Sequence, residues 1–516
     1  MAATNAPSTT KETERKYELA EKVRLPDPER LVGRGKPAVT GERQPEDQQL
    51  DAVYFDTAAL ALAQAGITLR RREGGSDAGW HLKLPSGVDS RDELRLPLGQ
   101  ARRTPPGELT ALTRVHTRGE ALKPVVRLRT RRRRWLLADG TGQALAELAE
   151  DRVTAHTLGH GTEATHWREV EVELTEHGSV DLLDRIEKRL LKAGAERSSS
   201  SSKLDRVLAD RIPDGPGHRD DADSAGAVVI DYLRAQVDTL RRYDPAVRQD
   251  APDSVHKMRV SSRRLRSAMQ AYRRVLDRDA TRPLTDELKW LAGELAPARD
   301  SEVMAARFGG VVDQLPAQLV LGPVAGTLDR TFGRQQAQGR ERAVAALDSA
   351  RYLALQDALD GLLTDPPLTE KADRPADREL PASVRRAHRR LRRRMAAADE
   401  QPAGPDRDGA LHEARKAAKR LRYATEVAEP AIGEPARRLR KRLKKMQSVL
   451  GDHQDTVVAR PVLRDLGAQV HLDGGNGFTF GLLHGIEATR AERAERELPG
   501  RWARLEQPKI TRWLRG

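Results

Sequence analysis

Polar and apolar side chains alternate in short runs between about residues 12 and 175, and glycine, proline or aspartate separates one run from the next. This period of two is typical of β-strands that have one apolar face. Because eight strands are sufficient to close a barrel, we expect an antiparallel β-barrel in this part of the chain. The eight runs are 12–19, 51–57, 67–73, 80–85, 91–98, 125–137, 144–153 and 167–174.

Helical periodicity replaces the alternation in the rest of the chain. An amphipathic helix is predicted at 180–195, and a polar segment containing glycine and proline follows it. We therefore predict a multidomain α+β protein. Its parts are a disordered N-terminus at 1–9, an eight-stranded barrel domain with flanking helices at 10–210, a linker at 211–223 and an all-α domain at 224–516.

One face of each predicted strand is charged, and the other face is mostly apolar. Carboxylates repeat on the first and last strands, as Glu12, Glu14 and Glu18 beside Lys16, and as Glu169, Glu171 and Glu173. Cations repeat on the strands between them, as Arg70, Arg72, His81, Lys83, Arg91, Arg95, Arg127, Arg129 and Arg131. One such strand alone would indicate a sheet with a solvated face. Eight strands that follow the same rule indicate a closed barrel with a charged lumen.

A lumen with both carboxylates and cations is suited to a metal-bound chain of phosphates. Carboxylate oxygens are the ligands that Mg²⁺ and Mn²⁺ prefer, and lysine and arginine neutralise phosphate oxygens that a metal does not reach. Hydrolysis would follow if a metal or a carboxylate positioned water for in-line attack on the terminal phosphorus. An outer-membrane barrel also has a polar lumen, but the sequence lacks the aromatic girdles and the export signal that such a barrel needs.

The run Glu12-Thr13-Glu14-Arg15-Lys16 matches the E-x-E-x-K signature of the CYTH family, the triphosphate tunnel metalloenzymes. The order of the later strands also resembles that family over residues 10–210. The resemblance implies an eight-stranded antiparallel tunnel that hydrolyses or cyclises triphosphates with Mg²⁺ or Mn²⁺.

The resemblance also implies roles for individual residues. The residues expected to bind metal or to position water are Glu12, Glu14, Glu169, Glu171 and Glu173. The residues expected to bind triphosphate are Lys16, Arg70, Arg72, Lys83, Arg127, Arg129 and Lys203. Of these, Glu12, Glu14, Lys16 and Glu171 are the expected catalytic residues. Glu147 and Asp151 share one strand face and could join the acidic set, whereas Lys203 could also be an ordinary surface charge.

The helical half contains an internal duplication. Residues 255–269 and 411–425 align without a gap, and a second pair, 288–303 and 443–458, follows at almost the same separation. A basic stripe on one helix is usually a solvated face, but its duplication favours a binding surface. The matched residues are His256, Arg259, Arg263 and Arg266 with His412, Arg415, Lys419 and Arg422, then Lys289 with Lys444 and Asp300 with Asp455.

The first four positions lie within about 80° of a helix circumference. Met258, Leu265, Met269 and Tyr272 lie on the other side, so the stripe is expected to face away from the local core. We expect a structural role for Asp300 and Asp455 in orienting cations or capping helices.

A histidine that begins a basic stripe with a downstream R-L-R, found twice, resembles the CHAD family over about residues 224–510. The resemblance implies two pseudo-symmetric helical bundles around a basic groove that binds inorganic polyphosphate. It assigns polyphosphate binding to the eight matched stripe residues, to Lys289 and Lys444, and to His484. The basic helices 385–395 and 436–446 would add to the same field if the bundles bring them together.

The net charge of +14 and the pI near 10 also indicate an anionic partner. The absence of cysteine excludes disulfides and thiolate metal sites, and no segment is long and apolar enough to span a membrane. We therefore expect a cytoplasmic protein that hydrolyses triphosphate or polyphosphate ends, and it could associate with polyphosphate granules. A non-catalytic polyphosphate-binding or granule-targeting protein is the alternative. Nucleic-acid binding by the arginine-rich helices is less favoured, because aromatic residues for base stacking make up only 3% of the chain.

Overall fold

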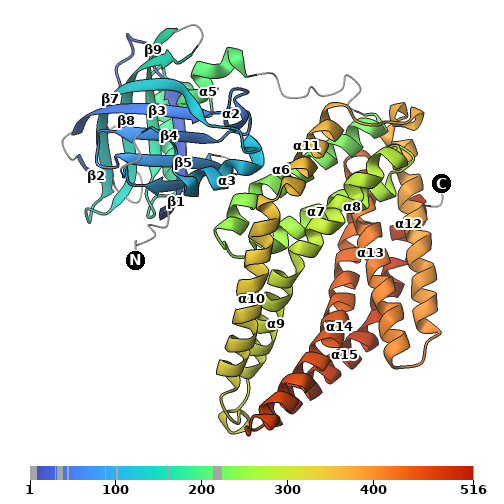
Figure 1. The fold of residues 1–516 in the computed structure, drawn as a ribbon. Coiled ribbons are helices and arrows are strands. Elements are labelled where there is room, and N and C mark those ends of the chain that lie inside the picture. Colours follow the sequence, from blue (N-terminus) through green and yellow to red (C-terminus); the bar gives the residue numbers. More distant parts are fainter. Residues whose placement is uncertain are drawn as a thin grey trace. The chain divides into compact units, whose positions relative to one another are not determined.

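The computed structural model of the chain describes residues 8–28, 31, 39–42, 46–87, 89–99, 103–159, 163–212 and 223–514. The chain divides into two compact units, 1–215 and 216–516 (Figure 1). The division falls inside the predicted linker, of which residues 213–222 lie outside the described part. Residues 1–7 of the predicted disordered N-terminus also lie outside it, whereas residues 8 and 9 belong to a strand.

The first unit contains the closed antiparallel barrel that the alternation predicts. Around the barrel the strands follow the order β1-β6-β5-β4-β3-β7-β8-β9, and β9 pairs with β1 to close it. The eight strands are β1 (Ser8–Glu18), β3 (Glu46–Asp56), β4 (Thr68–Glu73), β5 (Gly79–Gly87), β6 (Ser90–Leu96), β7 (Lys123–Asp139), β8 (Ala144–Thr157) and β9 (Ala164–Leu174). Two short strands, β2 (Val39–Glu42) and β10 (Glu196–Arg197), extend β7 and β1.

Helices cover the apolar outer face of the barrel. Helices α2 (Ala61–Gln64) and α3 (Gly107–Thr117) pack on the outward side chains of β4, β5 and β6, such as Trp80 and Leu82. Helix α4 (Val180–Lys192), close to its predicted bounds, packs on β1, β8 and β9. Its buried residues are Leu182, Leu183, Ile186 and Leu190, the three-to-four spacing of an amphipathic helix.

Helix α5 (Lys203–Leu208) lies at one end of the barrel and is followed by the 3-10 turn η1 (Ala209–Arg211). Leu204 and Leu208 pack on Tyr54, Val126 and Leu128, which belong to the inward faces of β3 and β7. Burial of each leucine contributes about 2 kcal/mol. This end of the lumen is therefore filled by apolar side chains, and the charged part of the lumen lies beyond it.

The second unit is entirely helical. Its helices are α6 (Ala225–Arg248), α7 (Ser254–Ala271), α8 (Arg278–Glu294), α9 (Ala296–Val312), α10 (Val324–Asp348), α11 (Ala350–Thr364), α12 (Ala376–Asp399), α13 (Pro405–Ile432), α14 (Glu434–Leu472), α15 (Phe478–Leu505) and α16 (Pro508–Thr511). Short 3-10 turns are η2 (Ala317–Leu319), η3 (Glu370–Asp373) and η4 (Arg512–Leu514). None of the helices in the described ranges is both long and apolar enough to cross a membrane.

The duplicated segments form equivalent helices. The first aligned pair lies on α7 and α13, and the second pair lies on α8 with α9 and on α14. Pro297 begins α9, and the aligned residue of the second copy is Asp452. The first copy is divided at Leu295 into α8 and α9, whereas α14 runs unbroken for 39 residues.

The predicted apolar side of the first copy is confirmed. Met258, Leu265, Met269 and Tyr272 are all buried, with exposed fractions of 1% or less. The basic stripe of α7 therefore faces away from the core.

Candidate functional site

Carboxylates of three neighbouring strands lie side by side in the barrel lumen. The register pairs Glu14 of β1 with Glu173 of β9, and Glu173 with Glu147 of β8. Burial and the carboxylates of Glu12, Glu14 and Glu147 raise the pKa of Glu173 to about 8. Glu173 has no ion-pair partner among the described residues, and only the more distant Lys83 opposes the rise of its pKa, so its carboxyl group is mostly protonated near neutral pH.

Lys16 lies beside this carboxylate group. Its Nζ is 3.2 Å from Oε1 of Glu14 and 3.1 Å from Oε1 of Glu171. Burial opposes the charged form, but the two carboxylates raise the pKa of Lys16 above its ordinary range. Lys16 is therefore a fixed cation between two of the predicted metal ligands.

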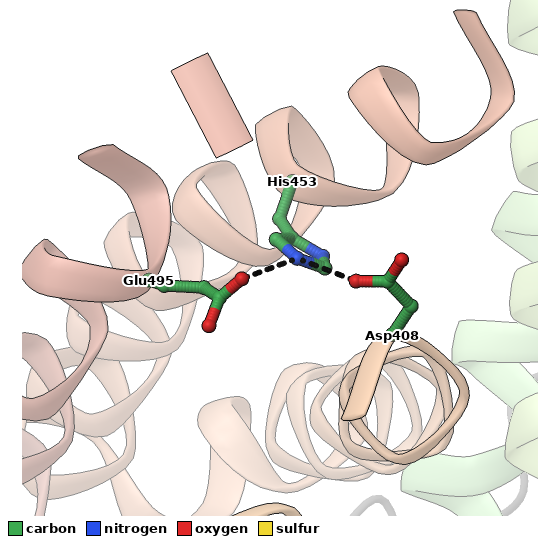
Figure 2. Close-up of side chains that lie close together, drawn as sticks. All are labelled: Asp408, His453 and Glu495. Atoms are coloured by element: carbon green, nitrogen blue, oxygen red, sulfur yellow. Dashed lines mark ion pairs between the residues drawn. The ribbon is translucent and has the colours of Figure 1, made fainter. Parts of the chain in front are cut away.

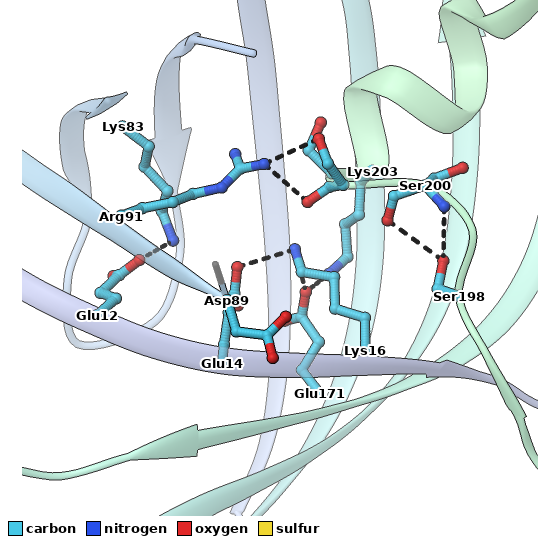
Figure 3. A network of polar contacts seen from close by, with 12 residues as sticks. Glu12, Glu14, Lys16, Lys83, Asp89, Arg91, Glu171, Ser198, Ser200 and Lys203 are labelled. Atoms are coloured by element: carbon cyan, nitrogen blue, oxygen red, sulfur yellow. Dashed lines mark hydrogen bonds and ion pairs between the residues drawn. The ribbon is translucent and has the colours of Figure 1, made fainter. Parts of the chain in front are cut away.

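Lys203 enters the lumen from the first turn of α5. Ser202 caps this helix by accepting a hydrogen bond from the backbone N–H of Asp205, and the cap fixes the start of the turn. The Nζ of Lys203 is 2.6 Å from Glu171 (Figure 3). It also lies 3.0 Å from Asp151 and 2.7 Å from Glu169. The three carboxylates have ligand atoms within 4.8 Å of one another. Asp151 thus joins the acidic set, and Lys203 is a buried tunnel residue.

The opposite wall of the lumen holds a second group of charges. Nζ of Lys83 lies 2.5 Å from Oε2 of Glu12 and 3.7 Å from Oε1 of Glu93. Nδ1 of His81 lies 2.8 Å from Oε1 of Glu93, and burial lowers the pKa of His81 to about 3, so the imidazole is neutral. Arg70 donates to the hydroxyl of Tyr54 at 3.3 Å.

Arg72 also points inward and pairs with Asp77. Burial and the neighbouring Arg70 and Arg132 lower its pKa to about 9. The predicted residues Arg70, Arg72 and Lys83 therefore share the lumen with the predicted acidic residues.

The prediction for β7 is wrong about which face is inward. Arg127 and Arg129 lie on the outer face, where they pair with Asp51 at 2.6 and 3.7 Å, and Arg129 is 62% exposed. Arg131 has the same parity along the strand, and the inward positions hold Arg132 and Arg134.

Arg132 and Arg134 take part in the charged lumen. Nη2 of Arg132 lies 2.7 Å from Asp151 and 2.5 Å from Glu171. Arg134 lies 2.7 Å from Glu147. Alternation could not identify them, because residues 131–134 are four consecutive arginines and both faces carry the same charge.

The helical unit has a groove of about 1810 Å³ between the duplicated helices. It is lined by residues of α7, α9, α13, α14 and the C-terminal segment, with 15 lysines and arginines against two aspartates, Asp300 and Asp455. The predicted residues in this lining are His256, Arg259, Arg263, His412, Arg415, Lys419, Arg422 and Lys444. From the predicted basic helix 436–446, Arg438, Lys441, Arg442 and Lys445 also line it.

Five of the 15 cations form ion pairs, and the other ten have none among the described residues; the five are Lys257, Arg259, Arg264, Arg299 and Arg422. Arg259 pairs with Asp300 at 3.0 Å, and Nε of Arg263 donates to the hydroxyl of Tyr423 at 2.9 Å. Burial and the neighbouring Arg415 and Arg263 lower the pKa of Lys419 to about 7. Burial is the larger cause of this shift, and the three neighbouring arginines add to it, so positive charge is concentrated around Lys419.

The family comparisons agree with both resemblances. A CYTH domain is matched at residues 10–208 and a CHAD domain at 231–464. The chain belongs to the CYTH–CHAD proteins. Uncharacterised proteins of two Mycobacterium tuberculosis strains are each 39% identical to it over 520 residues, which covers 97% of this chain and 97% of theirs.

Solved structures with matching parts are also known. PptA from Streptomyces chartreusis is 22% identical and covers 54% of this chain and 99% of its own, with a TM-score of 0.46. The CHAD domain of the plant Ricinus communis is 25% identical and covers 59% and 97%, with a TM-score of 0.41. A putative adenylyl cyclase from Hippeastrum with a dominant triphosphatase activity is 17% identical and covers 40% and 100%, with a TM-score of 0.23.

Some residues of the CHAD domain lie outside the groove that the sequence predicts for them. Arg266, Lys289 and His484 are not among the described residues that line it. Lys289 is exposed on α8. The basic helix 385–395 also lines a different surface.

A histidine and two carboxylates form a separate cluster in the CHAD domain. Nε2 of His453 on α14 lies 3.2 Å from Asp408 of α13 and 3.3 Å from Glu495 of α15 (Figure 2). Each carboxylate also pairs with an arginine, Arg460 at 3.2 Å and Arg407 at 2.8 Å. Because the negative charge is balanced by arginines, the cluster is best understood as a link between three helices.

Proposed function

We propose that the protein hydrolyses inorganic triphosphate, or the ends of polyphosphate, in the CYTH tunnel with Mg²⁺ or Mn²⁺, and that the CHAD groove captures the polyphosphate chain. The observation that carries the proposal is the excess of 15 lysines and arginines over two aspartates in one groove of the same chain as the tunnel. Such an excess favours a ligand with many negative charges at short spacing.

The tunnel carboxylates fit a hard divalent cation. Glu12, Glu14 and Glu173 meet around one part of the lumen, and their mutual repulsion raises the pKa of Glu173 to about 8. A bound cation would relieve this repulsion and would supply Lewis-acid activation of a phosphoryl oxygen. Glu169 and Glu171 with Asp151 are a second set of oxygen ligands, now held by Lys203.

The tunnel cations would hold the phosphates. Lys83, Arg70 and Arg72 project from β4 and β5 toward the acidic strands, and Lys16, Lys203 and Arg132 stand among the carboxylates. These groups would orient the terminal phosphate for in-line attack by neutralising its oxygens. Arg132 replaces Arg127 and Arg129 as a phosphate-binding residue in this proposal, because it lies in the lumen and they lie on the outer face.

Polyphosphate fits the CHAD groove better than nucleic acid does. Tyr423 is the one aromatic residue among the described lining residues, and it is fully buried as the partner of Arg263. A base-stacking surface is therefore missing from this lining, whereas a chain of phosphates needs only cations.

A specific observation also favours the non-catalytic alternative. Glu171 is in contact with three cations at once, Lys16, Lys203 and Arg132. If these ion pairs persist in solution with metal present, the tunnel would bind phosphates without turnover, and the protein would act as a polyphosphate-binding or granule-targeting protein.

Phosphate release decides between the two functions. The purified protein is incubated with triphosphate, polyphosphate, ATP or thiamine triphosphate and either Mg²⁺ or Mn²⁺. We expect turnover of triphosphate or polyphosphate, and loss of it in Glu171→Gln. The matched control is Glu120→Gln, since Glu120 is exposed after α3. Unchanged turnover in Glu171→Gln would refute the tunnel site, and absence of turnover in the native protein would establish the alternative.

Binding is tested separately. Polyphosphate and duplex DNA of equal total charge compete for the native protein and for Arg415→Gln/Lys419→Gln. We expect polyphosphate to win and its affinity to fall in the double variant. Preference for DNA would refute the proposed ligand of the CHAD groove.

A further inference from the structure

A second basic groove of about 1210 Å³ lies elsewhere in the CHAD domain. It is formed by the end of α7, the start of α8, α12 and one residue of α13, and it shares no lining residue with the first groove. Its charged lining residues are Arg273, Arg278, Arg282, Asp286, Arg386, Arg389, Arg390, Arg392, Arg393 and Arg420. The arginine-rich helix 385–395 supplies half of them.

Positive side chains far outnumber negative ones in the lining of the second groove. It has nine arginines, no lysine and a single carboxylate, Asp286. Among the described residues, only Arg392 of these nine has an ion-pair partner, Glu506 at 3.3 Å. Burial and repulsion between neighbouring arginines lower the pKa of Arg386 and of Arg390. Charge held in this way costs stability unless an anion compensates it.

The duplication shows that this charge is not required by the fold. At the equivalent place in the second copy, Glu426 pairs with Arg264 and Arg422 at 3.2 and 3.3 Å, and Glu429 pairs with Arg437 and Arg440. The same alignment places Gln270 at the position of Glu426 and Arg273 at the position of Glu429. One copy thus has glutamates that pair with nearby arginines, and the other copy has no carboxylate at either position.

The chemistry of the lining restricts the ligand class. Arginine binds phosphate oxygens through two parallel N–H groups, which makes it suited to repeated phosphates. The lining has no aromatic residue among those described, so it offers no surface on which bases could stack.

Arg266 lies between the two grooves. It interacts electrostatically with Asp286 of the second groove and with Arg263 of the first. The duplicated stripe of α7 therefore continues from the first groove toward the second.

We propose that this arginine groove is a second binding site for inorganic polyphosphate, which holds another segment of the polymer beside the one in the first groove. The inference rests on the proposed function of the CHAD domain. Two linked sites on one polymer bind more tightly than either alone, because the second contact is intramolecular. Long chains should therefore gain from the second groove, and short chains should occupy the two grooves independently.

Isothermal titration calorimetry measures the number of phosphate-binding sites on each protein. Tripolyphosphate and long-chain polyphosphate are titrated separately, so that the effect of polymer length on affinity can be compared. The variant is Arg282→Gln/Arg389→Gln/Arg393→Gln. The matched control is Arg330→Gln/Arg334→Gln/Arg493→Gln, which removes equal charge from exposed positions outside both grooves. Gln270→Glu/Arg273→Glu is a second variant that restores the carboxylates of the other copy. Circular dichroism verifies that each protein is folded.

We expect three tripolyphosphate sites in the native protein and the control, one in the CYTH tunnel and one in each groove, and two sites in either groove variant. We also expect the groove variants to lose affinity for the long polymer by at least about tenfold and to show a shallower salt dependence. If both groove variants keep all three sites and the native salt dependence, the second groove is not a binding site.

Failure of the underlying function gives a different result. If Arg415→Gln/Lys419→Gln weakens binding while the groove variants do not, only the second site is refuted. If no protein binds either phosphate, the function of the CHAD domain and the second site are refuted together. Binding of a single-stranded oligonucleotide in preference to polyphosphate, lost in the groove variants, would overturn the ligand class.

Discussion

Replacement of Lys419 by methionine tests whether the first groove concentrates positive charge. Arg415 and Arg422 from α13 and Arg263 from α7 surround Lys419, and Asp455 of α14 partly offsets them. Burial and these arginines lower the pKa of Lys419 from 10.5 to about 7. Because one pH unit is worth about 1.4 kcal/mol, the charged ammonium destabilises the fold by up to about 5 kcal/mol below pH 7.

The sign of the pH dependence follows from the two pKa values. The unfolded chain binds the Lys419 proton between pH 7 and 10.5 while the folded chain has released it, so stability rises with pH across this window. Lys419→Met removes the penalty. We expect the variant to be more stable by about 2–5 kcal/mol near pH 6, and the gain to shrink by about 1.4 kcal/mol per pH unit above pH 7.

Urea unfolding followed by circular dichroism measures this difference. Lys444→Met is the matched control, because Lys444 lines the same groove but is exposed, and its stability should change by less than about 0.5 kcal/mol. A Lys419→Met variant that is no more stable than the native protein near pH 6 would refute the electrostatic reasoning.

Lys419→Met should also change how the protein binds polyphosphate. A bound polyanion restores the charge of Lys419, so the native protein should take up a proton when it binds polyphosphate near pH 8. Calorimetry in buffers of different ionisation enthalpy detects this uptake, which should be absent in Lys419→Met. The variant should thus be more stable and bind more weakly.

Three further results are expected. The affinity of the tunnel for Mn²⁺ should rise as the pH increases through about 8, because the metal binds the ionised form of Glu173. In Glu173→Gln, the affinity measured by calorimetric titration should depend less on pH. Phosphate release from triphosphate should stay within about twofold of the native rate in Arg129→Gln, because Arg129 lies on the outer face. It should fall at least about tenfold in Lys83→Gln, because Lys83 lies in the lumen. Equal rates in the two variants would contradict the assignment of the two faces. His453→Gln should lower the free energy of unfolding, measured by urea titration, by about 1–3 kcal/mol. Unchanged stability would show that the contacts of His453 with Asp408 and Glu495 do not stabilise the fold.

The sequence predicts the eight barrel strands, the helix at 180–195 and the duplicated helices, but not the other helices that flank the barrel. Period-two alternation located the eight barrel strands, because a strand with one apolar face must alternate. It also placed Glu12, Glu14, Lys16 and Glu171 on one face, since strand parity is a local property. The gap-free repeat identified α7 and α13 as equivalent helices with buried and basic sides.

Tertiary structure decided which charges meet. The four arginines at 131–134 look alike in sequence, and only pairing with Asp151 and Glu147 makes Arg132 and Arg134 the inward ones. Lys203 reaches the lumen because α5 packs into the end of the barrel, a long-range contact that no local pattern encodes. Helix 385–395 lines a groove of its own because the packing of α12 on α13 directs its arginines there. The periodicity of a helix or strand determines which of its side chains share a face. The residues that this face contacts depend on packing between segments far apart in the chain.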